Sequence, residues 1–457
     1  MKKDKAYLIA VGLLFVELLA GVVWGIQRGL SSLFAKDVLL ITSFTQIGMV
    51  TSVFGLTKAV TNLCMGALSD RVGRKPVIVV GAIVSALGGM VIASADQFTG
   101  MLLGTALIGL GGGSTFVGIM VAMTEAIPSR IGLAMGLFQL AAYGGSTLGT
   151  SLAGYLAVSY GLRQPFSVLM AISAVGAVAG FLLIPETNGF VHKEGARLKE
   201  NVNITSYARQ LAPMYFAGFS SKIMDSLIVS FLPLYLTGQG MDINRVATVM
   251  SAFTFSWALL QPVTGHTSDR IGRKRIIVVG LAGSVISVVT FTLTGGFTLL
   301  VACSLLLGVE AALFYTPLVA MVSDIAPSEL EGTLIGSYRF FRDMGYFVGP
   351  LLLGAIADNM GLANSFYATS IILLIATVVI QLLAKETVGR ADLGSPRSPG
   401  GTAASGARSR GRPPPWRCLR GSSQGSSGPR PTSSPTSSSG SCPSLSAMGL
   451  RRSSSQP

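Results

Sequence analysis

Hydrophobic positions dominate long stretches of this chain, and the charged residues are confined to short segments between them. Four runs contain no Asp, Glu, Lys or Arg: Val77–Ala95, Thr99–Thr124, Gln164–Pro185 and Asn359–Ala384. A helix needs roughly 20 apolar residues to cross a bilayer. Each run therefore predicts a membrane-spanning helix.

A fifth uncharged run, Ile276–Val309, covers 34 residues and is too long for one span. The pair Gly295-Gly296 near its middle predicts a turn between two spans. The whole pattern predicts an all-α membrane protein with twelve spans: 7–27, 41–68, 77–95, 99–123, 132–158, 165–184, 211–236, 246–267, 276–294, 298–320, 333–356 and 363–384.

The composition supports this class and excludes others. Charged residues make up 12% of the chain, against about 25% in soluble domains. The four cysteines, two in spans and two near the C-terminus, show no disulfide or metal-ligand spacing. No Gly-x-x-x-x-Gly-Lys phosphate loop is present. We expect neither a cofactor, a metal nor an enzymatic activity, and no direct drive by nucleotide hydrolysis.

Lys and Arg gather in the loops on one side of the predicted bundle. They follow the even-numbered spans, as Arg71 and Arg270 do, and they crowd the N-terminus. The loops on the other side hold little beyond Lys36, Arg163 and Arg245. Because cytoplasmic loops are enriched in Lys and Arg, we expect both termini in the cytoplasm and the bundle in the cell membrane.

A ten-residue motif occurs twice. Gly-Ala-Leu-Ser-Asp-Arg-Val-Gly-Arg-Lys starts at Gly66, and Gly-His-Thr-Ser-Asp-Arg-Ile-Gly-Arg-Lys starts 199 residues later at Gly265. The charge rule puts both copies on one side of the membrane, so an even number of spans separates them. Six spans fit, which predicts two parallel six-helix repeats related by an axis along the membrane normal.

The motif resembles the signature loop between spans two and three of the major facilitator superfamily, and the architecture matches over residues 1–387. In that family such loops hold the cytoplasmic gate closed through reversible ion pairs. The resemblance implies a gating role for two copies of one residue set, with Glu125 and Asp324 as expected partners: Gly66, Asp70, Arg71, Gly73 and Arg74, then Gly265, Asp269, Arg270, Gly272 and Arg273. The alternative is a loop that only anchors topology.

A second motif links the chain to one branch of that family. Span eleven contains Gly345, Gly349 and Pro350 in a Gly-x-x-x-Gly-Pro pattern similar to the span-five motif of drug/proton antiporters. Span five itself has Gly145 and Gly149, with Thr where Pro is expected. The alternative to an antiporter motif is close helix packing by small residues.

Ionisable residues inside the predicted spans are few. Each costs roughly 2.5–3.5 kcal/mol on insertion scales, so each is expected to face a cavity or a partner. The candidates for binding or coupling, with one amide, are Glu17, Arg28, Lys58, Asn62, Lys222, Asp225, Glu310, Arg339, Arg342 and Asp343. The surplus of cations among them would suit an anionic solute.

The spacing of these residues predicts where they point. Glu17, Trp24 and Arg28 share one face of span one. Lys222 and Asp225 take two of the corresponding places in span seven. Both sets are expected to face the axis between the repeats, where transporter substrate sites lie. A structural alternative is that Lys222 with Asp225, and Arg342 with Asp343, merely neutralise each other.

The chain is predicted to divide into an N-terminal half (1–187), a cytoplasmic linker (188–210), a C-terminal half (211–390) and a disordered basic tail (391–457). The tail is rich in Arg, Pro, Ser and Gly and lacks Lys. Its composition is typical of an out-of-frame or vector-derived extension. A native basic tail that binds anionic lipid or nucleic acid is the alternative, and we assign the tail no function.

These features predict a monomeric secondary transporter that moves a small molecule across the lipid bilayer by alternating access. Proton-coupled efflux of small organic compounds is our first expectation, with a proton or another ion as the driver and no nucleic-acid partner. Uptake of a small anion by symport is one alternative. A membrane receptor that binds without transport is the other.

We expect coupling to depend most on Glu310, which has no basic residue one turn away and precedes Pro317. Glu310→Gln should abolish transport driven by a pH difference but retain solute exchange at equal pH, because Gln mimics the neutral acid. Glu17→Gln should weaken transport less. Flux into vesicles with and without an imposed pH difference measures both effects. Normal pH-driven flux in the Glu310 variant would remove that residue from the mechanism.

Overall fold

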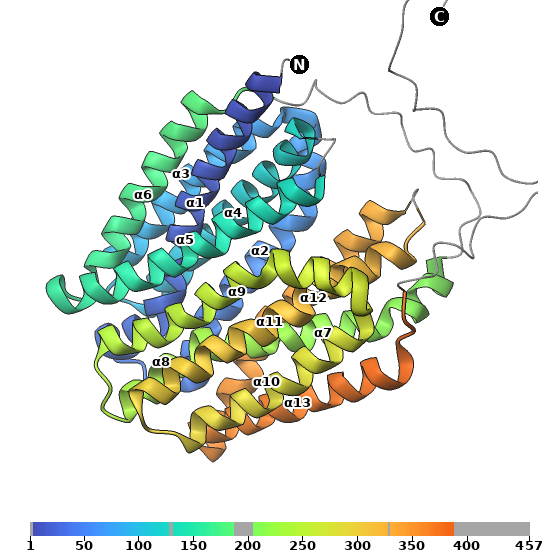
Figure 1. Cartoon of the computed structure of the whole chain (residues 1–457). Helices are drawn as coiled ribbons and strands as arrows, with labels where there is room; N and C mark the ends of the chain where they lie inside the picture. The colour runs from blue at the N-terminus through green and yellow to red at the C-terminus, as the bar shows by residue number, and fades with distance from the viewer. Residues whose placement is uncertain (1–2, 128–130, 187–203, 328–329, 388–457) are drawn as a thin grey trace, which may run out of the picture. The chain divides into compact units, whose positions relative to one another are not determined.

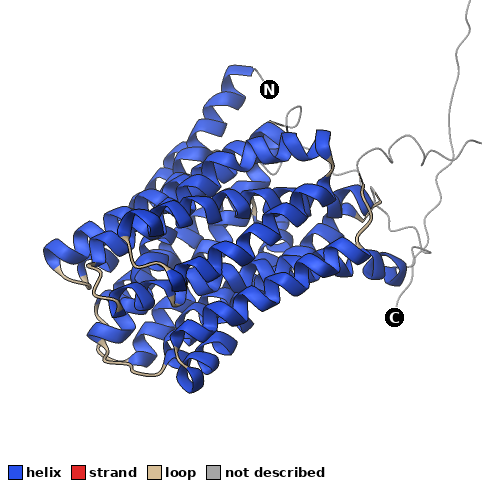
Figure 2. Ribbon diagram, turned by 60° about the horizontal axis from the view of Figure 1, so that its bottom comes forward, coloured by secondary structure: helices blue, strands red, loops and turns tan. Residues whose placement is uncertain are grey.

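The computed structural model describes residues 3–127, 131–186, 204–327 and 330–387, which form helices and short connections without a strand (Figure 2). Twelve long helices of this described part are labelled in Figure 1: α1 (Lys3–Leu33), α2 (Phe44–Val72), α3 (Arg74–Ala93), α4 (Phe98–Ala126), α5 (Ile131–Tyr160), α6 (Gln164–Leu183), α7 (Ile204–Ser230), α9 (Ile243–Ile271), α10 (Arg273–Leu293), α11 (Phe297–Ile325), α12 (Glu331–Met360) and α13 (Leu362–Leu383). A π-helical turn, η1 (Phe34–Val38), follows α1, and a short helix, α8 (Leu232–Gly238), follows α7.

Each predicted span coincides with a described helix, α7 and α8 together forming the seventh. Eleven helices of the described part are long and apolar enough to cross a membrane. The remaining long helix is α5, which has 30 residues but is interrupted by small polar ones. It packs against α1 and α9, so its Gly, Ser and Thr residues meet protein rather than lipid.

The helices repeat in length as well as in order. α2 and α9 have 29 residues each, as do α4 and α11, while α5 and α12 have 30 each. Figure 1 shows the first set, blue to green, beside the second set, yellow-green to orange. We call the end of the bundle that carries Arg74 and Arg273 the basic-loop face, and the other end the opposite face.

Two antiparallel helix pairs join the sets: α2 with α12, and α5 with α9. Small residues let these helices approach closely. A Cβ on Gly48 would lie 3.0 Å from the carbonyl carbon of Pro350, and a Cβ on Gly154 would overlap with Ala247. Both contacts lie toward the opposite face, so that end of the bundle is tightly closed.

Glycines also set the contact between α1 and α5. A Cβ on Gly145 would fall on the carbonyl of Leu18, and one on Gly149 would fall on the carbonyl of Val22. In the second set, a Cβ on Gly345 would likewise fall on the carbonyl of Phe219 in α7. The Gly-x-x-x-Gly pattern therefore serves close packing in both sets.

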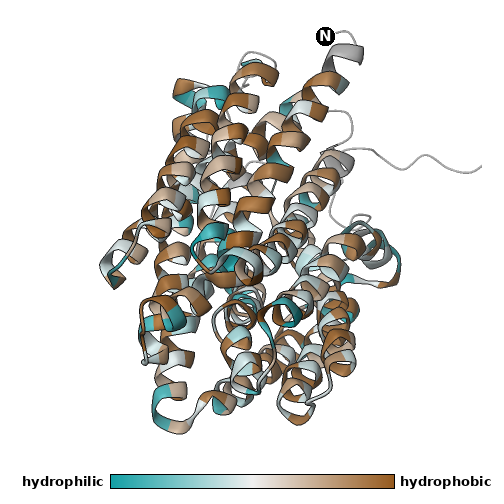
Figure 3. Cartoon of the chain, turned by 90° about the vertical axis from the view of Figure 1, so that its left-hand side faces the viewer, coloured by the Kyte–Doolittle hydropathy of each residue, from teal (hydrophilic) through white to brown (hydrophobic). Residues whose placement is uncertain are grey.

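Large apolar side chains cover the outside of the bundle. Leu182, Ile286 and Leu382 are 71%, 68% and 74% exposed. Figure 3 shows hydrophobic residues along much of the length of the helices. Large apolar side chains on the outside of a helical bundle fit a body surrounded by lipid.

Replacing Gly149 by Leu should destabilise the bundle, because the new side chain collides with the backbone of α1, which cannot move aside without separating two helices. We expect a loss of about 1–3 kcal/mol, as in overpacked cores, measured by thermal unfolding in detergent. Gly144→Leu is the matched control, since a Cβ there meets nothing within 4 Å. Equal stability of the two variants would contradict the packing role.

Candidate functional site

A buried ion-pair network connects the two six-helix sets at the middle of the bundle. The Arg28 guanidinium in α1 lies 2.5 Å from the Asp225 carboxylate in α7. The Lys222 ammonium lies 2.8 Å from the same carboxylate. Arg28 also donates a hydrogen bond of 2.9 Å to the hydroxyl of Tyr346 in α12. Arg28 thus joins three helices from both sets, α1, α7 and α12.

A second cluster lies on α12 and bridges to α2. The Arg342 guanidinium donates to the Asp343 carboxylate at 2.7 Å and 2.9 Å, and to the Tyr315 hydroxyl at 2.8 Å. The Asn62 amide of α2 donates to Asp343 at 3.1 Å. Asp343 is therefore a second carboxylate shared between the sets.

The ammonium of Lys58 lies between these clusters and a separate carboxyl group. It sits 3.9 Å from the centre of the Trp24 ring and 5.2 Å from that of Phe116, within the range of cation–π attraction. Two small cavities share Lys58 as a lining residue. One of about 30 Å³ also contains Glu17, and the other also contains Asp343.

The charges around this interface do not balance. Among the described residues, four cationic side chains, Arg28, Lys58, Lys222 and Arg342, lie around two carboxylates, Asp225 and Asp343. A fifth cation, Arg339 of α12, contacts the sulfur of Met120 in α4. Glu17 reduces the excess of positive charge only if it is ionised, and unbalanced charge in a low-dielectric interior is costly.

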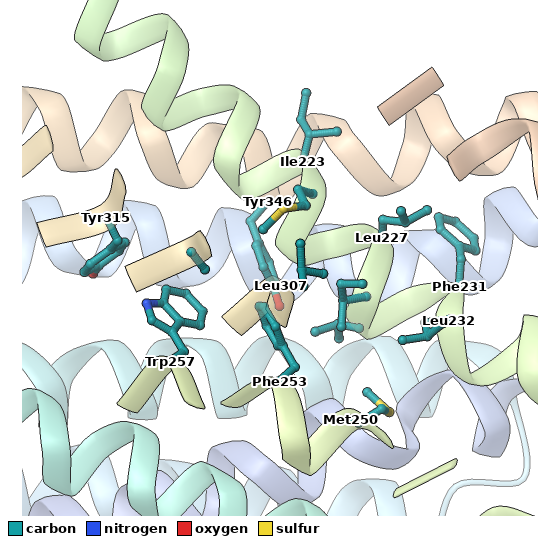
Figure 4. Close-up of a cluster of buried hydrophobic side chains, with 14 of the residues drawn as sticks. Ile223, Leu227, Phe231, Leu232, Met250, Phe253, Trp257, Leu307, Tyr315 and Tyr346 are labelled. Atoms are coloured by element: carbon teal, nitrogen blue, oxygen red, sulfur yellow. The ribbon is translucent and has the colours of Figure 1, made fainter. Parts of the chain in front are cut away.

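Aromatic rings form one wall of the site. The Tyr143 ring of α5 lies 4.4 Å from the Trp257 ring of α9, and the Trp257 ring lies 5.4 Å from that of Tyr315 in α11. Figure 4 shows Trp257 and Tyr315 beside Phe253 and Tyr346. The indole Nε1 of Trp257 is buried without a hydrogen-bond acceptor in the described structure. These rings are buried against one another, and the Trp257 N–H is a donor without an acceptor among the described residues.

The two copies of the repeated motif adopt the same geometry at the basic-loop face. The Arg74 guanidinium lies 2.8 Å from Asp70 and 2.7 Å from Glu125. Glu186 accepts hydrogen bonds from the backbone N–H groups of Arg74 and Lys75, at 2.9 Å and 3.2 Å. It thereby satisfies the start of α3, where a negative charge is favourable.

The second copy repeats these contacts. The Arg273 guanidinium lies 3.1 Å from Asp269 and 2.5 Å from Asp324. Glu386 accepts from the backbone N–H of Arg273 at 2.9 Å. Gly272 has φ +109°, and Gly73 in the first copy has φ +100°, a conformation that only glycine adopts without strain. The contacts named here each join residues of the same set of six helices.

Comparison with known proteins identifies the family. The model of the Major Facilitator Superfamily matches residues 13–246 and 214–425, which together cover most of the chain. The chain belongs to the major facilitator superfamily. It is a multi-pass membrane protein of this family, whose members are transporters rather than enzymes.

The relatives are distant but extensive. An uncharacterised transporter of the superfamily from Methanocaldococcus jannaschii is 23% identical, over 74% of this chain and 88% of its own. The multidrug resistance protein MdtG of Proteus mirabilis is 26% identical, over 71% of this chain and 82% of its own.

Solved structures share the fold. The nucleoside transporter NupG has a TM-score of 0.69 at 14% identity, over 82% of this chain and 100% of NupG. A POT family transporter bound to 5-aminolevulinic acid has a TM-score of 0.71 at 13% identity, over 82% of this chain and 96% of its own. At these identities the likeness concerns architecture alone.

Most of the charged candidate residues predicted from the sequence lie close together in the structure. Glu310 lies apart from them. The carboxyl group of Glu310 lies between α11 and α10 and accepts a hydrogen bond of 3.0 Å from Ser287. A Cβ on Gly283 of α10 would lie 2.6 Å from its Oε1. The Glu310 side chain therefore points toward α10 rather than toward the central ion-pair network.

Other candidate residues lie at helix ends or in contacts between helices. Gly66 and Gly265 lie near the ends of α2 and α9, and Arg71 and Arg270 are exposed at those ends. A Cβ on Gly349 would lie 3.1 Å from the Cα of Ile223 in α7. Pro350 lies inside α12, where its backbone approaches α2. The linker residues 188–203, with the tail 391–457, lie outside the described residues.

Sequence reasoning missed a contact that closes the opposite face. Asp358, at the end of α12, accepts hydrogen bonds from the backbone N–H groups of Phe44 and Thr45 at 2.6 Å and 3.0 Å. Its carboxylate also accepts from the hydroxyl groups of Ser43 and Thr45 at 2.9 Å and 2.6 Å. A carboxylate of the second set thus caps the first turn of α2 in the first set.

Asp358→Ala should loosen this closure. Thr51 accepts a hydrogen bond from Ser230 across the same interface. In a Thr51→Cys variant, the thiol should react faster with an impermeant reagent when Asp358→Ala is also present than when Asp358 is retained. The background lacks the native cysteines. Asp242→Ala is the matched control, because Asp242 caps its own helix α9 through the N–H of Arg245. Unchanged reactivity in the Asp358 variant would show that this cap does not hold the face closed.

Proposed function

We propose that this secondary transporter exports small organic compounds that carry a negative charge, through alternating access of the interface between residues 1–187 and residues 211–390. The observation that carries the proposal is the surplus of buried cations at that interface, beside an aromatic wall. An organic anion would neutralise part of the surplus and stack on the rings. A cationic solute would add to the surplus of positive charge, and a purely aliphatic solute would not stack on the rings.

The distribution of contacts supports a cycle of two states. The sets meet closely toward the opposite face, where Asp358 caps α2 and where Ser151 and Ser251 share a hydrogen bond of 2.9 Å. The ion pairs of Arg74 with Glu125 and of Arg273 with Asp324 join residues of the same set. We infer that this conformation is closed on the opposite face, and that the basic-loop face, which we assign to the cytoplasm, opens to admit solute.

Closing the basic-loop face requires its helix ends to come together as rigid pieces. The ion pairs of Arg74 with Glu125 and of Arg273 with Asp324 each tie helix ends within one set. We therefore assign the repeated motif a gating role: it keeps each set rigid at the end that moves.

The direction of export follows from two arguments. MdtG, a multidrug resistance protein, is among the relatives. An inside-negative membrane potential also favours exit of an anion by about 2.3 kcal/mol per charge at 100 mV. Export of an anion therefore needs no further driver, although a coupled proton could add to it.

Uptake by proton symport is a second candidate, and the position of Glu17 favours it. Glu17 and Lys58 line the same small cavity, so an ionised Glu17 offsets the charge of Lys58. A proton on Glu17 would leave Lys58 free to attract a solute anion. Proton and anion would then bind together, as symport requires. Glu310 remains a sequence-based candidate, but Glu17 is nearer the proposed solute site.

Lys58→Gln should weaken transport of anionic compounds selectively. Loss of one charge-assisted contact, worth about 1.5–3 kcal/mol, raises the KM for an anion by roughly 10- to 150-fold. Lys58→Arg should restore most of the affinity. Lys36→Gln is the control, since Lys36 is exposed on the opposite face.

The measurement is flux in everted vesicles with a panel of labelled organic anions, cations and neutral compounds, with and without a pH difference. Accumulation of anions inside everted vesicles supports export. Loss of anions from them, dependent on protons, supports symport. Transport restricted to cations, unaffected by Lys58→Gln, would contradict the proposed substrate class.

A further inference from the structure

An apolar groove lies on the outer surface of the first six-helix set, away from the solute site. It runs between α3 and α6, which lie side by side in Figure 1. Its volume is about 460 Å³, within the roughly 300–1,000 Å³ typical of small-molecule sites. The residues that define it include Ile83, Ala86, Leu87, Met170, Ala174 and Phe181.

The groove exists because small side chains line its floor and large ones its rims. Ala86 of α3 and Ala174 of α6 leave a depression between Leu87 and Phe181, which are 46% and 60% exposed. Every lining residue is apolar. The groove opens to the lipid-facing side, so its natural occupant is a hydrocarbon chain rather than a water-soluble compound.

The length of the groove matches one leaflet. On α3 it extends from Val79 to Met90, which is about 16 Å at a rise of 1.5 Å per residue. The hydrocarbon core of a bilayer is roughly 30 Å thick, so one leaflet is about half of that. The groove starts at the basic-loop face, where α3 begins and α6 ends.

A positive charge marks the end of the groove at that face. The ammonium of Lys75, in the first turn of α3, lies 4.6 Å from the ring centre of Phe181. Phe181 is itself a lining residue. A lipid whose chain fills the groove would therefore carry its headgroup beside a lysine.

The corresponding place in the second six-helix set is built differently. Val285 and Leu374 stand where the first set has Ala86 and Ala174. Gln381 stands in place of Phe181, and its carbonyl accepts a hydrogen bond of 2.7 Å from Lys274, the counterpart of Lys75. The groove lining thus differs between the sets, and the lysine of the second set is bound to a backbone carbonyl.

We propose that this groove binds an anionic phospholipid, with one acyl chain between α3 and α6 and the phosphate beside the Lys75 ammonium. The hydrophobic effect holds the chain, and the lysine selects the negative headgroup. This site goes beyond the proposed transport function, because no lining residue of the groove belongs to the central network.

Native mass spectrometry of the full chain, purified in detergent and given an equimolar mixture of phosphatidylglycerol and phosphatidylcholine with matched chains, tests the proposal. Wild-type protein should retain phosphatidylglycerol with a roughly fivefold preference, as one lysine near a lipid headgroup supplies. Lys75→Gln should bring that preference close to one. Lys274→Gln, the matched control in the second set, should leave it unchanged.

The double variant Ala86→Val/Ala174→Leu introduces the residues of the second set and fills the groove. The amount of tightly bound lipid should fall at least tenfold for both phosphatidylglycerol and phosphatidylcholine. The unfolding temperature should equal that of the wild type. A single variant, Ala174→Leu, provides the same test if the double variant fails to fold. Retained preference for phosphatidylglycerol in Lys75→Gln, or undiminished lipid binding in a folded filled-groove variant, would overturn the proposal.

Discussion

A charge inside the hydrocarbon region must find its partner within the protein, because neither lipid nor bulk water is available to solvate it. The contact between Arg28 and Asp225 meets this demand across the boundary between the two six-helix sets. Breaking a buried pair by removing one partner typically costs about 3–5 kcal/mol. The sets are therefore tied at mid-depth, and any movement between them must pivot near this contact or exchange it for another.

The other buried charges at this boundary share the same few carboxylates. Asp225 is already shared by Arg28 and Lys222, and Asp343 is shared by Arg342 and Asn62. Neither carboxylate can compensate every neighbouring cation. Under the proposed function, an incoming anion would supply the missing negative charge at the same depth and weaken the pairs that hold the two sets in one arrangement. The proposal thereby links binding and movement through one electrostatic balance.

Much of the fold could be predicted from the sequence, because hydropathy and the repeated motif act over whole helices. The twelve helices and the family were predicted correctly. The contact of Arg74 with Glu125 also matched a partner expected from the resemblance. α5 was predicted as the span 132–158 although small polar residues interrupt it.

The candidate site was harder to predict from the sequence than the fold, because it depends on which helix faces meet. Asp358 looks like an ordinary exposed acid at a helix end, and only the packing of α12 on α2 makes it a cap for Thr45. The ring contact of Tyr143 with Trp257 joins residues of different sets. Glu310 lacks charged neighbours on its own helix, but Ser287 of α10 is its partner, which no spacing rule within one helix reveals.

Alternating access of the two sets is the central claim, and paired distance measurements test it most directly. Spin labels at Val72 and Ile271 report on the basic-loop face, and labels at Leu40 and Met360 report on the opposite face; all four side chains are exposed. In lipid nanodiscs, a transported anion should shorten the first distance and lengthen the second within one population. Two distances that stay constant, or that shorten together, under conditions of measured transport would contradict the account.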